Sequence, residues 1–247
     1  MKKKTVTLFG GSGFLAKYIV SELIKAGHKV NSICRNPHLV TELRLLGPIE
    51  SLDIYKGNIL HKSSIERYFD GSDIIINLVG ILFENNSQGF HQAHVQGIKN
   101  IAELSKKNNI KQLIHFSSIG ANVNGESKYQ QTKGEGEESL LNIFPSANIL
   151  RPSIVFGKKG FLQMQSNLLK SLPFAATFSN NKFQPIDVRD IANTVIKLIE
   201  QDQIKGEIFE LGGPENLNLK QIYSLIMKAI GIKRFIIPMP INVAKLI

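Results

Sequence analysis

Hydrophobic residues occur along the chain in short runs that alternate with segments of helical spacing. The runs are rich in β-branched and aromatic residues, which predicts buried strands, and the intervening apolar positions lie three or four residues apart, which predicts amphipathic helices. The predicted strands are 5–9, 30–34, 52–55, 73–79, 112–116 and 147–155, and the predicted helices are 14–26, 38–46, 63–69, 90–107 and 128–141. Because strands that alternate with helices form right-handed crossovers, the pattern predicts a parallel sheet covered on both faces.

The alternation weakens after residue 156, where helices are predicted at 161–169, 188–201 and 219–229 and a strand at 207–211. We therefore expect an α/β protein with a doubly wound parallel sheet in residues 1–156 and a smaller C-terminal α/β lobe in residues 157–247. The chain closes with the apolar segment 235–247, which predicts either that the chain continues or that a partner covers this segment.

Composition narrows the class of protein. A chain of 247 residues that is 43% hydrophobic and 20% charged can bury a core and is not disordered. Its longest apolar run, 74–83, is about half the length of a membrane span. The start MKKKTVTLFGGSGF lacks the apolar stretch of a signal peptide. With Cys34 as its single cysteine, the chain forms no internal disulfide, so we expect a cytoplasmic protein.

The formal net charge of +10 raises the question of a nucleic-acid partner. Only six of the 30 basic residues are arginine, and the lysines are scattered, whereas nucleic-acid recognition favours clustered basic patches and Arg forks. We expect a solvated basic surface and no nucleic-acid binding, with weak attraction to an anionic membrane left open. We also expect no metal site, because His91 and His94 share their helix face with no carboxylate or cysteine.

A glycine-rich turn joins the first predicted strand to the first predicted helix. Gly10 can adopt a positive φ, and Gly13 allows the backbone to approach a pyrophosphate that lies on the helix N-terminus. Since this glycine string lies between a strand and a helix of one crossover unit, it predicts a Rossmann-type dinucleotide site rather than a structural turn. The residues expected to hold the cofactor here are Gly10, Gly11, Ser12, Gly13, Phe14 and Leu15.

The end of the second predicted strand bears on the choice of dinucleotide. An NAD site normally places an acid there for the ribose 2′-hydroxyl, but no acid occurs between Glu22 and Glu42. Arg35 occupies this position instead, where it can pair with a 2′-phosphate and stack on adenine. The alternative is that Arg35 is an ordinary surface arginine that does not contact a cofactor. The sequence thus predicts NADP(H) in preference to NAD(H).

Further motifs follow in order along the chain. They are 57–59 (GNI), 77–80 (NLVG), 117–118 (SS), 129–133 (YQQTK), 151–157 (RPSIVFG) and 185–192 (PIDVRDIA). With them the whole chain resembles the extended and atypical short-chain dehydrogenases/reductases, which are epimerase/dehydratase-like. The resemblance implies that Asn58 and Ile59 meet the adenine, where most relatives carry Asp in place of Asn58. It also implies that Val79 and Gly80 lie beside the cofactor ribose and Pro152 near the nicotinamide.

In enzymes of this family the Tyr of the Tyr-x-x-x-Lys motif is the general acid/base. The Lys lowers the phenol pKa and holds the ribose, and a Ser hydrogen-bonds the substrate carbonyl. The resemblance assigns these roles to Tyr129, Lys133 and Ser117, and Ser118 is also a plausible serine partner by its spacing from Tyr129. Because cofactor holding needs the same Tyr and Lys, their presence does not establish turnover. His94 stands where the family usually has Asn, which favours cofactor holding.

Three other residues of the predicted helix 128–141 are acidic. They are Glu135, Glu137 and Glu138. They are expected to form a solvated helix face.

Within the family, the segments HFSSIGANVNGESKYQQTKGEGE and FPSANILRPSIVFG look like the NAD(P)H-binding accessory subunits of respiratory complex I and their bacterial relatives. The leading hypothesis is therefore an NADP(H)-binding accessory or assembly protein without turnover, peripheral on the inner face of the membrane. The alternatives are an NADP-dependent oxidoreductase, epimerase or dehydratase for a nucleotide sugar or carbonyl compound, and an NADP(H)-sensing regulator. The apolar C-terminal lobe favours the first hypothesis over an enzyme.

Overall fold

The computed structural model describes residues 2–85, 88–158, 160–177, 181–201 and 205–238. The chain divides into two compact units, Met1–Pro152 with Arg189–Leu211 and Ser153–Val188 with Gly212–Ile247. This division differs from the expected single boundary at residue 156, because the chain leaves the first unit, enters the second, and returns before leaving again. The final part of the apolar ending, 239–247, lies outside the described residues.

The first unit contains a seven-stranded parallel sheet in the order β11-β6-β5-β4-β1-β2-β3. Its strands are β1 Thr5–Phe9, β2 Lys29–Cys34, β3 Leu52–Lys56, β4 Ile74–Asn77, β5 Gln112–Phe116, β6 Asn148–Pro152 and β11 Ile208–Leu211. The strand order reverses between β1 and β4, and in such sheets ligands bind at this point outside the carboxyl ends of the strands. The predicted doubly wound fold is confirmed.

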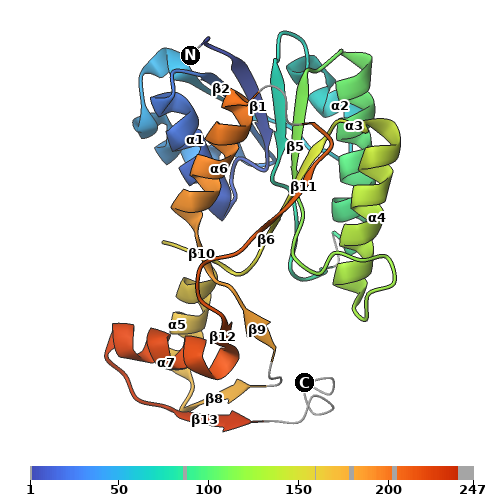
Figure 1. Cartoon of the computed structure of the whole chain (residues 1–247). Helices are drawn as coiled ribbons and strands as arrows, with labels where there is room; N and C mark the ends of the chain where they lie inside the picture. Colours follow the sequence, from blue (N-terminus) through green and yellow to red (C-terminus); the bar gives the residue numbers. More distant parts are fainter. Residues whose placement is uncertain (1, 86–87, 159, 178–180, 202–204, 239–247) are drawn as a thin grey trace. The chain divides into compact units, whose positions relative to one another are not determined.

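Helices cover both faces of this sheet. Figure 1 shows α1 and α6 on one face and α3 and α4 on the other. The helical segments of this unit are α1 Phe14–Lys25, α2 Lys62–Ile65, α3 Gly97–Lys107, α4 Lys128–Ile143 and α6 Val188–Glu200, with the 3-10 segments η1 Pro37–Leu46, η2 Ile49–Ser51 and η3 Glu66–Tyr68 and the π-helical turn η4 Gln92–Gln96. The predicted helix 38–46 is therefore a 3-10 segment, and it is interrupted by non-helical dihedrals at Val40.

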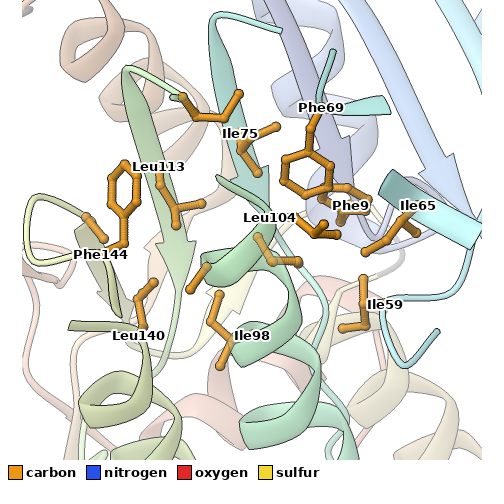
Figure 2. Close-up of a cluster of buried hydrophobic side chains, with 14 of the residues drawn as sticks. Phe9, Ile59, Ile65, Phe69, Ile75, Ile98, Leu104, Leu113, Leu140 and Phe144 are labelled. Atoms are coloured by element: carbon orange, nitrogen blue, oxygen red, sulfur yellow. The ribbon is translucent and has the colours of Figure 1, made fainter. Parts of the chain in front are cut away.

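The core beneath α3 and α4 is built from aliphatic and aromatic side chains that have almost no exposure. Figure 2 shows Phe9 at the end of β1 facing Phe69, and the ring centroids of this stacked pair lie 5.5 Å apart. Strand β4 is buried along its whole length, which agrees with its continuous apolar run. This packing holds the ends of β1 and β4 in fixed positions.

The chain re-enters the first unit at Arg189 and adds a helix and a strand to it. Helix α6 buries a stripe formed by Ile191, Val195 and Leu198, and β11 pairs with β6 as the seventh strand. The Gln112 side chain at the start of β5 donates to the backbone carbonyl of Leu198, which ties the end of α6 to the sheet. The predicted strand 207–211 is thus the edge strand of the main sheet and not part of a separate lobe.

The second unit is smaller and combines two helices with short strand pairs. Its elements are α5 Phe161–Ser171, α7 Leu219–Ile230, β7 Val155–Phe156, β8 Phe174–Thr177, β9 Lys182–Phe183, β10 Ile186–Asp187, β12 Leu217–Asn218 and β13 Phe235–Pro238. Helix α7 begins with a capping box between Asn218 and Gln221 and ends at Gly231, whose φ is +70°. In the described part of the chain no helix combines the length and apolar character that a membrane crossing requires.

Candidate functional site

The turn after β1 brings three backbone segments together. The N–H groups of Gly10 and Gly11 donate to the carbonyl of Ile33 at 3.1 and 3.0 Å, and the N–H of Gly13 donates to Gly10 at 2.9 Å. Gly10 has a φ of +89°, and a Cβ there would lie 3.1 Å from backbone atoms of Leu78 and Val79. Glycine is therefore required at Gly10 by both conformation and space.

Helix α1 leaves this turn with its N-terminus open. Its N-cap is Gly13, no side chain caps it, and the first turn contains no acidic residue. The first backbone N–H groups and the positive end of the helix dipole are consequently available to an anion. This arrangement fits a pyrophosphate.

A cavity of about 140 Å³ opens beside the turn, at the carboxyl ends of β1, β2 and β4. It is lined by Phe9, Gly10, Ser12, Gly13, Ile33, Cys34, Arg35, Gly57, Asn58, Ile59, Leu78, Val79, Gly80, Ile81 and Gln88. Eight of the 15 predicted cofactor residues are in this lining, whereas Ser117, Tyr129, Lys133 and Pro152 are not. Gly11, Phe14 and Leu15 belong to the turn and to the first turn of α1 but do not line the cavity.

Arg35 is exposed and follows β2 directly, as predicted. Its Nη1 donates to the Oε1 of Gln88 at 2.8 Å, and Gln88 is buried. No lining residue is acidic. Among the described residues, the lining therefore carries one cation, Arg35, and no carboxylate. The sequence analysis did not identify Gln88, because nothing in the local pattern marks it.

Asn58 and Cys34 also line the cavity. The Oδ1 of Asn58 accepts from the backbone N–H of Leu60 at 3.1 Å, and its own N–H donates to the hydroxyl of Ser64, so local bonds hold this residue. Burial raises the pKa of the Cys34 thiol, which stays protonated at neutral pH. Cys34 acts as a small apolar wall residue.

Helix α4 carries the Tyr-x-x-x-Lys motif and begins with a capping box between Ser127 and Gln130. Lys133 lies one turn inside the helix, is only 4% exposed, and donates from Nζ to the backbone carbonyl of Phe116 at 3.0 Å. Burial lowers its pKa to about 8, partly opposed by Glu137. A Cβ on Gly80 would lie 3.7 Å from this Nζ, so Lys133 adjoins the cavity wall.

His94 is buried beside Lys133, and both of its ring nitrogens are engaged. Nε2 accepts from the backbone N–H of Ile81 at 3.2 Å, and Nδ1 lies 3.1 Å from the hydroxyl of Thr132. Because a backbone N–H can only donate, Nε2 is unprotonated and Nδ1 carries the proton. Burial, reinforced by the Lys133 charge, lowers the His94 pKa to about 4. The imidazole is neutral at physiological pH.

Tyr129 packs against two rings from the turn that precedes α3. The centroids of His94 and Tyr129 lie 5.5 Å apart at 90°, and Phe90 meets Tyr129 edge-on at 5.7 Å. Phe90 also stacks on His94. This three-ring cluster fixes the plane of the Tyr129 ring.

Ser117 follows β5, and its buried hydroxyl has no hydrogen-bond partner among the described residues, nor does that of the neighbouring Ser118. Buried hydroxyls are nearly always paired, so these two are available to bond to a cofactor, a substrate or water. Pro152 ends β6, and its carbonyl accepts from the N–H of Ile119 at 3.2 Å. The Ser117 segment and Pro152 are thereby held together.

One expectation for α4 is wrong. Glu137 was expected on a solvated face but is 4% exposed and forms a double hydrogen bond with Arg151, at 3.0 Å to Nε and 2.5 Å to Nη2. This buried pair attaches α4 to β6. Arg151 also reaches Glu210 on β11.

Two glycines inside α4 allow close backbone contacts, Gly136 with the His94 turn and Gly134 with the loop at Asn122 and Val123. A Cβ on Gly136 would lie 2.2 Å from the carbonyl oxygen of His94, and one on Gly134 would lie 2.5 Å from the N–H nitrogen of Val123. Glycine is unfavourable inside a helix. The two glycines of the GEGE segment are therefore the sequence feature that could have indicated a close backbone contact here. The π-helical turn around His94 left no such signal in the sequence.

His115 is the other buried histidine near the site. It lies within β5, and its Nδ1 accepts from Asn77 at 3.1 Å. Burial holds its pKa well below the ordinary value. Among the described residues, no three His, Cys, Asp or Glu side chains form a possible metal site.

These features together define a dinucleotide-binding α/β protein of the short-chain dehydrogenase type. The turn, the open helix, the cavity and the Ser117–Tyr129–Lys133 segment all belong to the first unit. The model of the NAD dependent epimerase/dehydratase family matches residues 6–212. The chain belongs to this family, whose members bind NAD-type dinucleotides.

Two curated relatives match nearly the whole chain. The NADH-ubiquinone oxidoreductase 40 kDa subunit of Neurospora crassa is 28% identical over 98% of this chain and 64% of its own length. The NADH dehydrogenase [ubiquinone] 1 alpha subcomplex subunit 9 of Mus musculus is 29% identical over 95% of this chain and 63% of its own length. The chain thus spans less than two thirds of these relatives.

Among solved structures, the Bordetella bronchiseptica enzyme WbmG in complex with NAD superposes with a TM-score of 0.79. The two chains are 18% identical, and the match covers 97% of this chain and 82% of WbmG. This likeness supports the fold.

Proposed function

We propose that this protein is an NADP(H)-binding accessory or assembly protein of the respiratory NADH:ubiquinone oxidoreductase, and that it holds its cofactor without turnover. The observation that carries the proposal is the similarity to subunits of that complex over nearly the whole chain. As a peripheral protein it would bind the complex on the inner face of the membrane, in the cytoplasm.

The charges of the cavity support NADP(H) over NAD(H). Arg35 is the cation at the position that meets the adenosine ribose in this fold, and no acid in the lining competes for a ribose hydroxyl. Its bond to Gln88 engages Nη1 and leaves the other guanidinium donors for a 2′-phosphate. In this proposal Gly10 to Leu15 hold the pyrophosphate, Asn58 and Ile59 meet the adenine, and Val79, Gly80, Ser117, Tyr129, Lys133 and Pro152 hold the nicotinamide half.

The hydrogen bonds and the neutral form of His94 support cofactor binding without catalytic turnover. Its two nitrogens are engaged by Ile81 and Thr132, and its pKa of about 4 keeps it neutral. The charged imidazolium is therefore disfavoured at neutral pH, and both ring nitrogens are occupied by structural hydrogen bonds. The cofactor, when bound, supplies a nicotinamide able to carry a hydride.

Native purification tests the proposal. The tagged full-length protein, isolated from membranes of its native host with a mild detergent, should carry NADP(H) and co-migrate with NADH:ubiquinone oxidoreductase on native gels. Arg35→Ala should lose the nucleotide but keep the complex, whereas the exposed Arg44→Ala should keep both. Absence of wild-type protein from the complex would refute the accessory role.

A second candidate is an NADP-dependent oxidoreductase, epimerase or dehydratase. The unpaired hydroxyl of Ser117 favours it, because that group could receive a substrate carbonyl beside Tyr129. NADPH oxidation with a panel of carbonyl compounds and nucleotide sugars distinguishes the candidates. Turnover that is lost in both Ser117→Ala and Tyr129→Phe would favour the enzyme.

A further inference from the structure

The second unit contains a cavity of about 460 Å³ between helices α5 and α7. This volume is within the range of small-molecule sites. All lining residues belong to the second unit. The cavity is therefore formed within this unit alone.

The walls of this cavity are mostly aliphatic. Leu162 on α5 and Ile222, Leu225, Ile226 and Ile230 on α7 contribute much of the surface. The described residues contribute no lysine, arginine, histidine or amide side chain to the lining. Phosphates and sugar hydroxyls would find few partners there, whereas a hydrocarbon chain would bury its surface.

Only two lining residues have polar side chains, Ser166 and Glu215. The hydroxyl of Ser166 donates to the carbonyl of Leu162 at 2.7 Å, so its oxygen is left with acceptor capacity only. Glu215 is exposed and forms no ion pair with any described residue. Both groups can accept hydrogen bonds, and neither has a proton to offer.

We propose that this cavity binds a single-chain aliphatic molecule whose head group donates hydrogen bonds, as an alcohol or a protonated amine does. The hydrocarbon chain lies along the α5 and α7 side chains, and the head group meets Ser166 and Glu215. The carboxylate of Glu215 disfavours fatty acids and other anionic lipids by like-charge repulsion. This binding activity goes beyond the accessory function and does not depend on it.

A site-specific fluorescence titration tests the proposal, because the chain contains no tryptophan. Full-length Leu225→Trp places a reporter in the cavity wall, and Ser224→Trp places one on an exposed position of the same helix outside the lining. Dodecylamine, dodecanol and dodecanoate are titrated below their aggregation concentrations. Calorimetry on the unsubstituted protein provides the same comparison without a reporter.

We expect dodecylamine and dodecanol to give saturable shifts in Leu225→Trp and none in Ser224→Trp, with dodecanoate at least about tenfold weaker. Affinity should rise about fourfold per methylene in a chain-length series and then level off when the cavity is full. Glu215→Lys should reverse the preference between amine and carboxylate. The proposal is overturned if calorimetry detects no binding, if the three head groups bind equally, or if Glu215→Lys leaves their order unchanged.

Discussion

The Nδ1 of His94 lies 3.1 Å from the hydroxyl oxygen of Thr132, and this bond joins the π-helical turn to helix α4. Thr132 in turn donates to the carbonyl of Lys128, and His94 accepts from Ile81. A continuous chain of hydrogen bonds therefore runs from the loop after β4 into the first turn of α4. It fixes the start of α4, which carries Tyr129 on its first turn and Lys133 one turn further along.

The pKa of His94 makes stability depend on pH. Since the folded-state pKa of about 4 is below the unfolded value of 6.5, the unfolded chain binds more protons between these values. The free energy of unfolding should thus fall as the pH drops from 6.5 towards 4, with roughly 3 kcal/mol due to His94.

Urea unfolding at several pH values checks this. His94→Asn should show a shallower pH dependence than wild type, while His91→Asn, at an exposed position in the same segment, should not change it. Equal slopes in wild type and His94→Asn would contradict the assignment.

Arg35→Ala should weaken NADPH binding by about 10- to 150-fold, because one or more charge-assisted bonds to the 2′-phosphate are lost at about 1.5–3 kcal/mol. NADH binding should change little, since NADH lacks that phosphate. Titration calorimetry with both cofactors measures the effect, and the exposed Arg44→Ala provides the control. If wild type binds NADH as tightly as NADPH, the cofactor preference is wrong.

Gly10→Ala should destabilise the protein more than Gly27→Ala does. Both glycines have positive φ, at +89° and +84°, so alanine causes a similar backbone strain at either position. Only at Gly10 would the new Cβ meet backbone, 3.1 Å from Leu78 and Val79. Thermal melts should rank the variants in that order, and dinucleotide affinity should fall only in Gly10→Ala. Equal melting temperatures would contradict this prediction, because they would show that the backbone at Leu78 and Val79 accommodates the new Cβ without loss of stability.

Tyr129→Phe should leave cofactor affinity within about tenfold of wild type, because a single neutral hydrogen bond contributes about 1 kcal/mol. Lys133→Met should weaken binding more, since it removes the buried ammonium beside Gly80. Wild-type affinity should also decline above pH 8, where Lys133 loses its proton. A larger loss in Tyr129→Phe than in Lys133→Met would reverse the assigned roles.

The alternating pattern was sufficient to predict the main sheet. β1 and β5 occupy the predicted residues, and β4 is the interior of its predicted apolar run. The 147–155 run was predicted as one strand but contains both β6 and β7, which belong to different units. Hydrophobicity alone does not distinguish them, because both segments are apolar and no turn residue other than Pro152 separates them.

The glycine turn follows β1 and Arg35 follows β2, as the sequence pattern predicted, because both positions depend only on where a strand ends. Gln88, His94 and Thr132 depend instead on tertiary contacts, and local sequence does not encode them. Glu137 was misassigned because its partner Arg151 comes from a distant strand. A helical carboxylate looks solvated in sequence until the residue that it meets is known.

The path of the chain between the two units also determines when the strands of the main sheet can pair during synthesis. The seventh strand, β11, pairs with β6 only after residues 153–188 have been made, so β6 remains an open sheet edge until Leu211 has emerged. An unpaired edge strand is a template for association with other chains. A fragment that ends after β6 should therefore aggregate, whereas the full-length chain closes this edge itself.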